Sequence, residues 1–277
     1  MVSYKLSQEM NQCIVDGIAK GYKEYLKVRE EKLENMRISH AYAWVKGNHI
    51  DDQVAEACAD LGVKYQHSKA GLSWKFLKFE TEDESISFII KNAKYFNKQA
   101  VINGKDAKGR IGEKKTYLAE LVEKNHKINF DEVDTVETDD IIQLGFEDIF
   151  GLNLEDEADL RENISEIDRF YLVTYELDPA HMISDISVFL PNPKNNKAYL
   201  VDNLTAYLNP EYAVDISSNL LEELNKQNEI RTPDAAMLGI EINDDYVEVE
   251  TNDDGQMDLD YELGLNDENE TRKDKHS

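Results

Sequence analysis

The sequence of 277 residues contains few cysteines and prolines and no long apolar run. Its two cysteines, Cys13 and Cys58, are too few for a disulfide framework, and neither has a CxxC partner for zinc. No stretch approaches the ~18 consecutive apolar residues of a membrane span. The initial segment, MVSYKLSQEM, lacks the apolar region of a signal peptide. These absences predict a cytoplasmic protein without a membrane segment.

Positive charge is also scarce, because 31 Lys and Arg residues stand against 57 Asp and Glu residues, a net charge of −26. Residues 1–128 carry +4, whereas residues 129–277 carry −30. Hydrophobic residues make up 41% of the chain, enough for a core, which excludes a wholly disordered protein. The acidic half either acts electrostatically, as a polyanion mimic or a cover for a basic surface, or is an ordinary solvated surface.

Two periodicities predict the secondary structure. Apolar residues at three-to-four spacing predict a long helix over residues 7–36 and a second helix over 51–61 that ends at Gly62. Shorter helices are expected over 114–125 and over 216–228, where Ser217 or Ser218 starts the helix. Strand-like patterns occur at residues 63–67, 74–79, 85–90, 170–177, 183–190 and 198–201. The short connections between these strands favour antiparallel meanders, with Pro191 and Pro193 in a turn.

We therefore predict an α+β fold with a long N-terminal helix, two antiparallel β-meanders with associated helices, and a disordered acidic C-terminal tail. Residues 1–128 form a mildly basic domain of helix plus meander in this prediction, and residues 129–242 form an acidic α+β domain. Residues 243–277 are too charged to bury an apolar face, so disorder is expected there.

The most basic region is residues 91–127, with ten basic and four acidic residues. Residues 103–111, NGKDAKGRI, have the GxxxxG spacing of a phosphate-binding loop and follow an expected strand at 100–102. A nucleotide-binding loop needs Lys and then Ser or Thr after the second glycine, where Arg110 and Ile111 stand. The simplest interpretation is a flexible basic surface loop, and the functional alternative is non-specific contact with phosphate. The candidate contact residues are Lys105, Lys108, Arg110, Lys114 and Lys115.

No motif predicts catalytic residues, a metal site or a cofactor. Residues 250–261 match a calcium-binding loop only in part, and the ExK tripeptide at Glu113 lacks the preceding metal-binding Asp of a nuclease. Three histidines lie close enough in sequence to be considered as ligands or bases, but without metal-binding spacing; they are His40, His49 and His67.

Two groups of segments carry a family resemblance. One is LSWKFLKF at residues 72–79 with the strand at 85–90, and the other combines FYLVTYE at 170–176, ISDI at 183–186 and DNL at 202–204. These segments resemble an uncharacterised family of prophage and mobile-element-associated proteins of Gram-positive bacteria. The resemblance implies a role connected with a phage or mobile element, and it transfers no site residues.

Together these observations predict a non-enzymatic interaction protein, related to a phage or mobile element. Its acidic C-terminal half is expected to bind a basic partner, such as a nucleic-acid-binding protein, or to mimic nucleic acid. The alternative is a nucleic-acid-binding protein or nuclease that uses residues 91–127, with Trp74 and Tyr95 as further contacts. A metabolic enzyme is the weakest hypothesis because cofactor fingerprints are absent.

Overall fold

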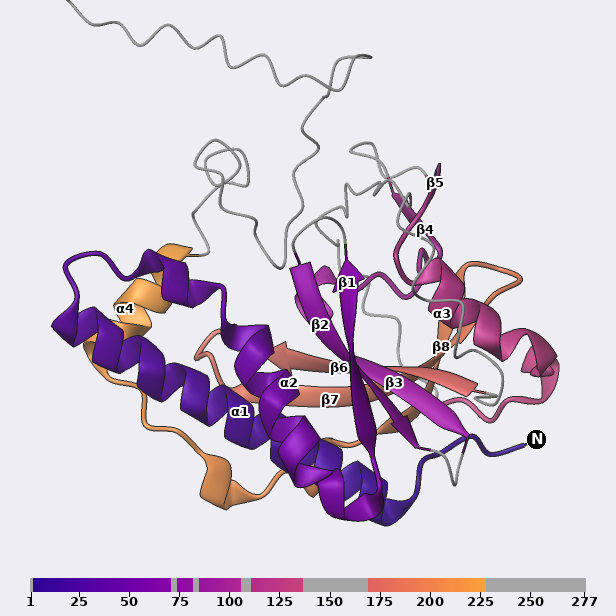
Figure 1. Cartoon of the computed structure of the whole chain (residues 1–277), viewed down its shortest axis with the longest axis horizontal. Coiled ribbons are helices and arrows are strands. Elements are labelled where there is room, and N and C mark those ends of the chain that lie inside the picture. The colour runs from indigo at the N-terminus through magenta and orange to yellow at the C-terminus, as the bar shows by residue number, and fades with distance from the viewer. Residues whose placement is uncertain (1, 71–73, 82–84, 106–110, 137–168, 228–277) are drawn as a thin grey trace, which may run out of the picture.

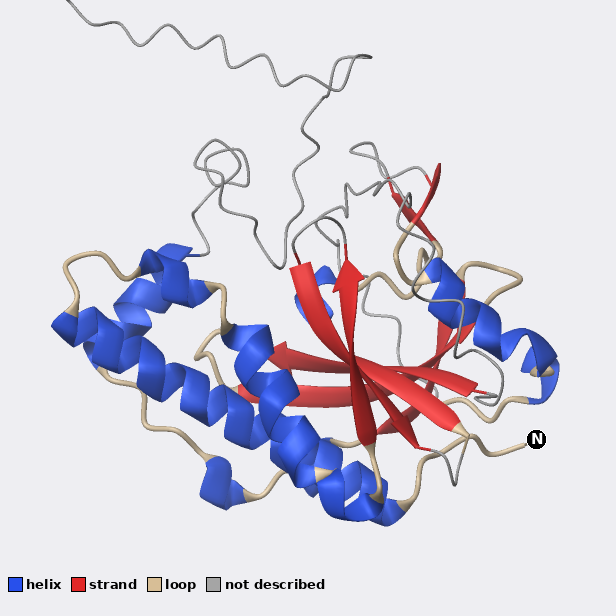
Figure 2. Ribbon diagram, viewed as in Figure 1, coloured by secondary structure: helices blue, strands red, loops and turns tan. Residues whose placement is uncertain are grey.

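The computed structural model describes residues 2–70, 74–81, 85–105, 111–136 and 169–227. The described part is an α+β fold in which a six-stranded mixed sheet packs against a long N-terminal helix (Figures 1 and 2). The predicted α+β class and the long helix are therefore confirmed. Among the described helices, none combines the length and apolar composition needed to cross a bilayer.

The sheet has the strand order β1-β2-β3-β6-β7-β8. Its first three strands are β1 (Lys64–Ala70), β2 (Trp74–Thr81) and β3 (Ile86–Asn92). Its last three strands are β6 (Arg169–Leu177), β7 (Ile183–Asn192) and β8 (Lys197–Asn203). Neighbours within each group of three pair antiparallel, and β3 pairs parallel with β6. The two groups of strands predicted from sequence thus share one sheet, joined at its centre by a parallel pair.

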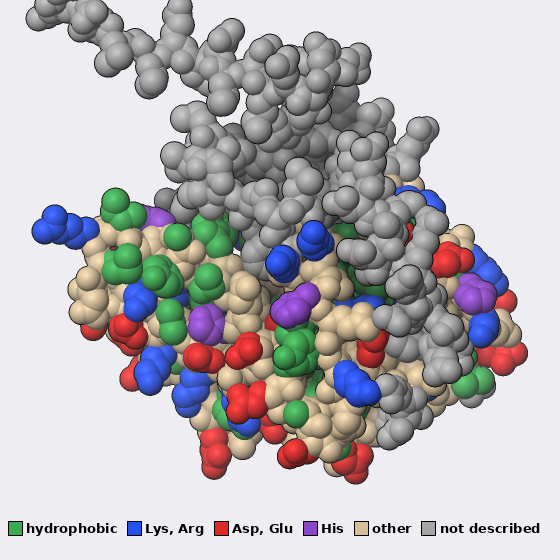
Figure 3. Space-filling view, in the orientation of Figure 1, with side chains coloured by type: hydrophobic (Ala, Val, Ile, Leu, Met, Phe, Trp, Pro, Cys, Tyr) green, Lys and Arg blue, Asp and Glu red, His purple; other side chains and the backbone are tan. Residues whose placement is uncertain are grey.

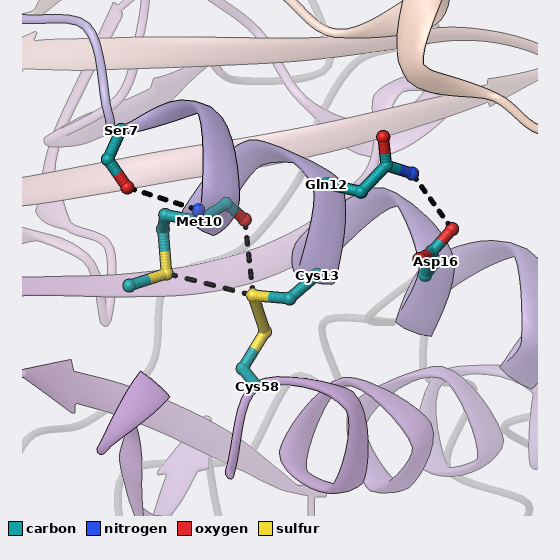
Figure 4. Close-up of a disulfide and its surroundings, with 6 residues drawn as sticks. All are labelled: Ser7, Met10, Gln12, Cys13, Asp16 and Cys58. Carbon is teal, nitrogen blue, oxygen red and sulfur yellow. Dashed lines mark hydrogen bonds between the residues drawn. A yellow bond between two sulfur atoms is a disulfide. The ribbon is translucent and has the colours of Figure 1, made fainter. Parts of the chain in front are cut away.

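Two long helices lie side by side across one face of this sheet (Figure 1). Helix α1 (Gln8–Asn35) begins at Ser7, whose Oγ accepts a hydrogen bond from the Met10 amide at 3.1 Å (Figure 4). Helix α2 (Lys46–Ala57) begins five residues before the predicted start at residue 51. A short 3₁₀ turn follows it and ends at Gly62, whose φ of 71° lies in the left-handed region that glycine favours.

A disulfide between Cys13 and Cys58 joins the start of α1 to the end of α2 (Figure 4). Both cysteines are buried, their Cα atoms are 5.2 Å apart, and 45 positions separate them in the chain. Two cysteines are too few for a disulfide framework, and the fold uses them for a single helix-to-helix bond.

Alternation along the strands supplies apolar side chains to both faces of the sheet. One face, with Phe88 and Tyr171 among its residues, packs under α1 and α2 in the main core. The opposite face presents Ile89 and Phe170 to a smaller core under α3 (Ala119–Glu123). Because both faces are covered, the central strands are nearly continuous apolar runs.

Three local predictions need correction. In the segment predicted as a helix at 114–125, residues 114–115 end β5 (Ile111–Lys115), and the helical part is α3 with the 3₁₀ turn Lys124–Lys127 after it. The strand expected at 100–102 is displaced to β4 (Asn103–Lys105). Pro191, expected in a turn, lies within β7, where its carbonyl accepts a hydrogen bond from a side chain. These segments are short, so a tertiary contact outweighs their local preference.

The helix predicted at 216–228 is confirmed as α4 (Ser218–Gln227), with Ser217 Oγ accepting from the Leu220 amide. The acidic tail at 243–277 and the predicted domain boundary at residue 242 lie outside the described residues. The boundary at residue 128 stays a prediction, and the main core includes side chains from both sides of it.

Candidate functional site

The predicted phosphate-contact loop is a two-stranded hairpin. β4 and β5 pair antiparallel, with Asn103 opposite Lys115 and Lys105 opposite Ile111. A nucleotide-binding loop leads into a helix whose N-terminus holds the phosphate, whereas here a strand follows the second glycine. The hairpin therefore lacks the geometry of a nucleotide-binding loop.

The five candidate contact residues can be placed only in part. Lys105 lies in β4 and Lys114 in β5, whereas Lys108 and Arg110 lie outside the described residues. Lys115 ends β5 with an exposed side chain. Their action as a phosphate-contact group stays a prediction.

The rest of the basic 91–127 region does not form one uniform solvated surface. The Lys91 ammonium lies 5.5 Å from the centre of the Tyr117 ring, and that of Lys94 lies 5.1 Å from the Tyr95 ring. Only 6% of the Lys124 side chain is exposed. Several lysine side chains of this region therefore contact aromatic rings or are shielded from solvent, and they do not all contribute to an exposed basic surface.

Lys124 belongs to a buried cluster of two lysines and one carboxylate on the α3 face of the sheet. Lys78 and Glu80, two residues apart in β2, share that face and form an ion pair at 2.9 Å. Lys124 Nζ lies 3.6 Å from the same Glu80 oxygen and donates to Ser87 Oγ at 3.5 Å. The two lysine side chains are only 8% and 6% exposed, so among the described residues one carboxylate faces two largely buried cations.

The electrostatics of this cluster follow from its burial. Burial lowers the pKa of the Lys124 ammonium, and the neighbouring Lys78 charge lowers that pKa further, whereas Glu80 opposes both effects. The cluster has an excess of positive charge and long contacts around one ammonium group. This arrangement favours the neutral amine at Lys124.

A buried carboxylate lies on the opposite face of the same strand. β2 pairs with β3 only from Phe79 to Thr81, and beyond that pairing the Leu77 amide donates to Asp51 Oδ2 at 2.9 Å. Burial raises the pKa of Asp51 to about 7, although the hydrogen bond from Leu77 opposes this shift. Asp51 thus caps the strand where the sheet opens, which is a structural role.

The remaining polar candidates do not converge. His40 pairs with Glu223 at 3.5 Å, and His49 with Glu24 at 3.6 Å, while His67 is exposed on β1. Within the described ranges, no three His, Cys, Asp or Glu side chains are grouped so as to hold a metal ion. A hollow of about 310 Å³ between α1 and residues 213–220 is lined by neither histidine nor cysteine.

Sequence reasoning missed the buried lysine cluster for a physical reason. The spacing of Lys78 and Glu80 in a strand indicates that both side chains share a face. Lys124 reaches them only because the short segment after α3 folds back over the sheet, 37 positions from Ser87 in the chain. The spacing of Lys78 and Glu80 in a strand is the only feature of the sequence that could have indicated this cluster.

Comparisons with protein-family models, curated proteins and solved structures give no match to this chain.

Proposed function

We propose that this is a non-enzymatic interaction protein whose acidic segments bind a basic partner protein or mimic nucleic acid toward it. The supporting observation is where the charge lies. Residues 137–168 and 228–277 together carry −23 of the net −26, so the rest of the chain carries only −3. The described residues are thus nearly neutral, and the acidic charge is concentrated in two segments of the sequence.

Two further points support this proposal over an enzyme. The polar clusters of the described residues consist of ion pairs and caps, as at Lys78–Glu80 and at Asp51. The two acidic segments are 32 and 50 residues long, enough to follow an extended basic surface. The connection with a phage or mobile element rests on the family resemblance and belongs to the same proposal.

The cytoplasmic location also stays a proposal. The low cysteine count was one reason for it, and the Cys13–Cys58 bond weakens that reason because disulfides persist mainly in oxidising compartments.

The test measures binding of the full chain to a fluorescent poly-lysine peptide at two salt concentrations, with duplex DNA as competitor. One variant carries Asp→Asn at four tail positions, Asp253, Asp254, Asp258 and Asp260. The matched control neutralises four exposed acids of the fold, Glu34, Asp52, Asp60 and Glu120. We expect the tail variant to lose affinity several-fold more than the control, with a steep salt dependence. Equal losses would contradict the proposal, because general net charge would then explain the binding.

The second candidate function is nucleic-acid binding through residues 91–127, supported by their ten basic residues against four acidic ones. Filter binding of the full chain to DNA and RNA tests it, with charge reversal of Lys105, Lys108 and Arg110 as the variant. Tight binding that the triple variant abolishes would replace the first proposal. No binding at low salt would eliminate this second candidate.

A further inference from the structure

β1 is an edge strand of the six-stranded sheet, and one of its faces is exposed. Tyr65, His67 and Lys69 alternate along β1 on this face, and all three are exposed. Ser68 and Ala70, whose side chains point to the opposite face, are buried. The exposed face of β1 is therefore open to solvent, in contrast to the central strands of the sheet, which are covered on both faces.

The helix layer ends before it reaches this face of β1. Phe79, the register partner of Tyr65 in β2, is fully buried in the main core, whereas Tyr65 is 53% exposed. The cover that α1 and α2 provide at this position therefore ends between β2 and β1. Figure 3 shows basic side chains and a histidine together over the region where Figure 1 places β1 and β2.

Two aromatic rings lie side by side on the exposed face. The ring centres of Tyr65 and His67 are 6.1 Å apart, and the ring planes meet at 84°. In this edge-to-face arrangement each ring keeps at least one face that the other does not cover. The pair can therefore stack with further planar groups.

Two lysines continue the same surface. Lys69 of β1 and Lys75 of β2 are register partners, so their side chains lie next to each other on one face of the sheet. Both lysines are exposed, and neither forms an ion pair with another described residue. Like charges directly opposite each other destabilise a strand pair, so an anion bound between the two ammonium groups would relieve their repulsion.

The combination of rings and lysines fits single-stranded nucleic acid. Exposed rings on a sheet stack with unpaired bases, which a duplex does not present, and ammonium groups beside the rings neutralise phosphates. Side chains on one face of a strand recur every ~6.7 Å, so Tyr65 and Lys69 are about 13 Å apart, a length suited to the two or three bases that sheet-based RNA-binding modules stack. An acidic peptide would use the lysines and leave the rings without a role.

We propose that the β1 surface, formed by Tyr65, His67, Lys69 and Lys75, binds single-stranded nucleic acid, with bases stacked on the two rings and phosphates at the two lysines. The surface is separate from residues 91–127 and from the acidic segments, so the inference stands without the proposed function. The acidic segments repel a polyanion, and the affinity is therefore highest at low salt.

The test measures binding of the full chain to a fluorescent oligothymidine at several salt concentrations. Tyr65→Ala should lower the affinity about ten-fold, whereas Tyr65→Phe, which keeps the ring, should retain it. Lys69→Gln with Lys75→Gln should also lower the affinity and reduce the slope of log affinity against log salt by ~1.4. The matched control is Lys194→Gln with Lys197→Gln, which makes the same change of charge at two exposed lysines of the β7–β8 turn and should leave the slope unchanged.

Competition separates this ligand from other polyanions. Duplex DNA and poly-glutamate should compete more weakly than unlabelled oligothymidine, because neither presents unpaired bases. Equal competition by either would overturn the inference, since charge alone would then explain the binding. Absence of binding at low salt, or equal losses for the two lysine pairs, would overturn it as well.

A second measurement needs no variant and covers the case in which a substitution disturbs the fold. The unmodified chain is photocross-linked to a single strand that contains 5-iodouracil, and the linked residue is identified by mass spectrometry. We expect cross-links at Tyr65 or His67. Cross-links found only elsewhere, including residues 91–127, would overturn the inference. Tyr65→Ala should bind poly-lysine as the parent does, so failure of this inference is distinguishable from failure of the proposed function.

Discussion

Gly21 of α1 lies against the backbone of Ile50 in α2, so closely that a Cβ atom on Gly21 would be 2.5 Å from Ile50 Cα. Gly17, one turn earlier, has the same relation to Val54, with 2.5 Å to its Cα. In the interior of a helix glycine costs stability relative to alanine. Here the missing side chains allow two helix backbones to approach, and that packing compensates for the cost.

We expect Gly21→Ala to destabilise the protein by ~1–3 kcal/mol, although alanine favours the helix, because the clash is with backbone that cannot rotate away. Denaturant unfolding measures the loss. Gly62→Ala is the comparison, since nothing lies within 4 Å of its Cβ position and only the positive φ opposes the substitution. A stabilised Gly21→Ala protein would show that α1 and α2 do not pack this closely.

The Cys13–Cys58 disulfide is expected to contribute ~2–4 kcal/mol to the free energy of unfolding, because it closes a long loop in the unfolded chain. Reductant should therefore lower the unfolding midpoint of the parent protein and leave that of a Cys13→Ala/Cys58→Ala variant unchanged. Thiol counting by mass spectrometry under denaturing, non-reducing conditions checks the bond directly. Two titratable thiols would contradict it.

Asp51 should make stability depend on pH. Because its folded pKa of about 7 lies above the ordinary value of 3.8, the folded state holds a proton that the unfolded state has released between those values. Its contribution is present below pH 4 and is lost as the pH rises to 7, by up to ~1.4 kcal/mol per pH unit. Asp51→Asn should remove this slope, so the difference in unfolding free energy between the parent and the variant should change from pH 4 to pH 7. Parallel curves from pH 4 to 7 would contradict the assignment.

Asn125 ties the segment after α3 to the centre of the sheet. Its side-chain amide donates to the Phe170 and Pro191 carbonyls at 2.9 and 2.8 Å, and its oxygen accepts from the Phe170 amide at 2.8 Å. Asn125→Asp removes both donors and sets a carboxylate against two carbonyls, so we expect a loss of at least ~3 kcal/mol at neutral pH. Lowering the pH until the aspartate is protonated should restore part of the lost stability. Unfolding at pH 4 and 7 tests both statements, with Asn129→Asp, an exposed site, as the control.

The lysine cluster predicts opposite outcomes for two substitutions. Glu80→Gln leaves Lys78 and Lys124 without a counter-charge and should cost ~3 kcal/mol or more, partly relieved by loss of a proton from Lys124 at high pH. Lys124→Met removes the excess charge and should be neutral or stabilising. Unfolding free energies at pH 7 and 9 measure both. Equal losses for the two variants would show that Lys124 is fully paired.

Much of the fold could be predicted from the sequence, and little of the candidate site. The N-terminal helix follows from apolar residues that recur every three or four positions, and α4 from its apolar spacing and the Ser217 cap. The candidate residues around Lys105 were chosen from local charge density. Charge density does not reveal which lysines the fold buries, and Lys124 is one that it does.

The sequence by itself determined α1, α4, most strands and the segregation of acidic charge, because each of these depends on neighbouring residues. The tertiary structure alone decided the Cys13–Cys58 bond, the parallel pairing of β3 with β6, and the burial of Arg29 and Lys124. Each of these brings together segments that lie far apart in the sequence, or segments that meet because the chain folds back on itself. Their partners are selected by the packing of helices and sheet around a common core, and no local pattern encodes that choice.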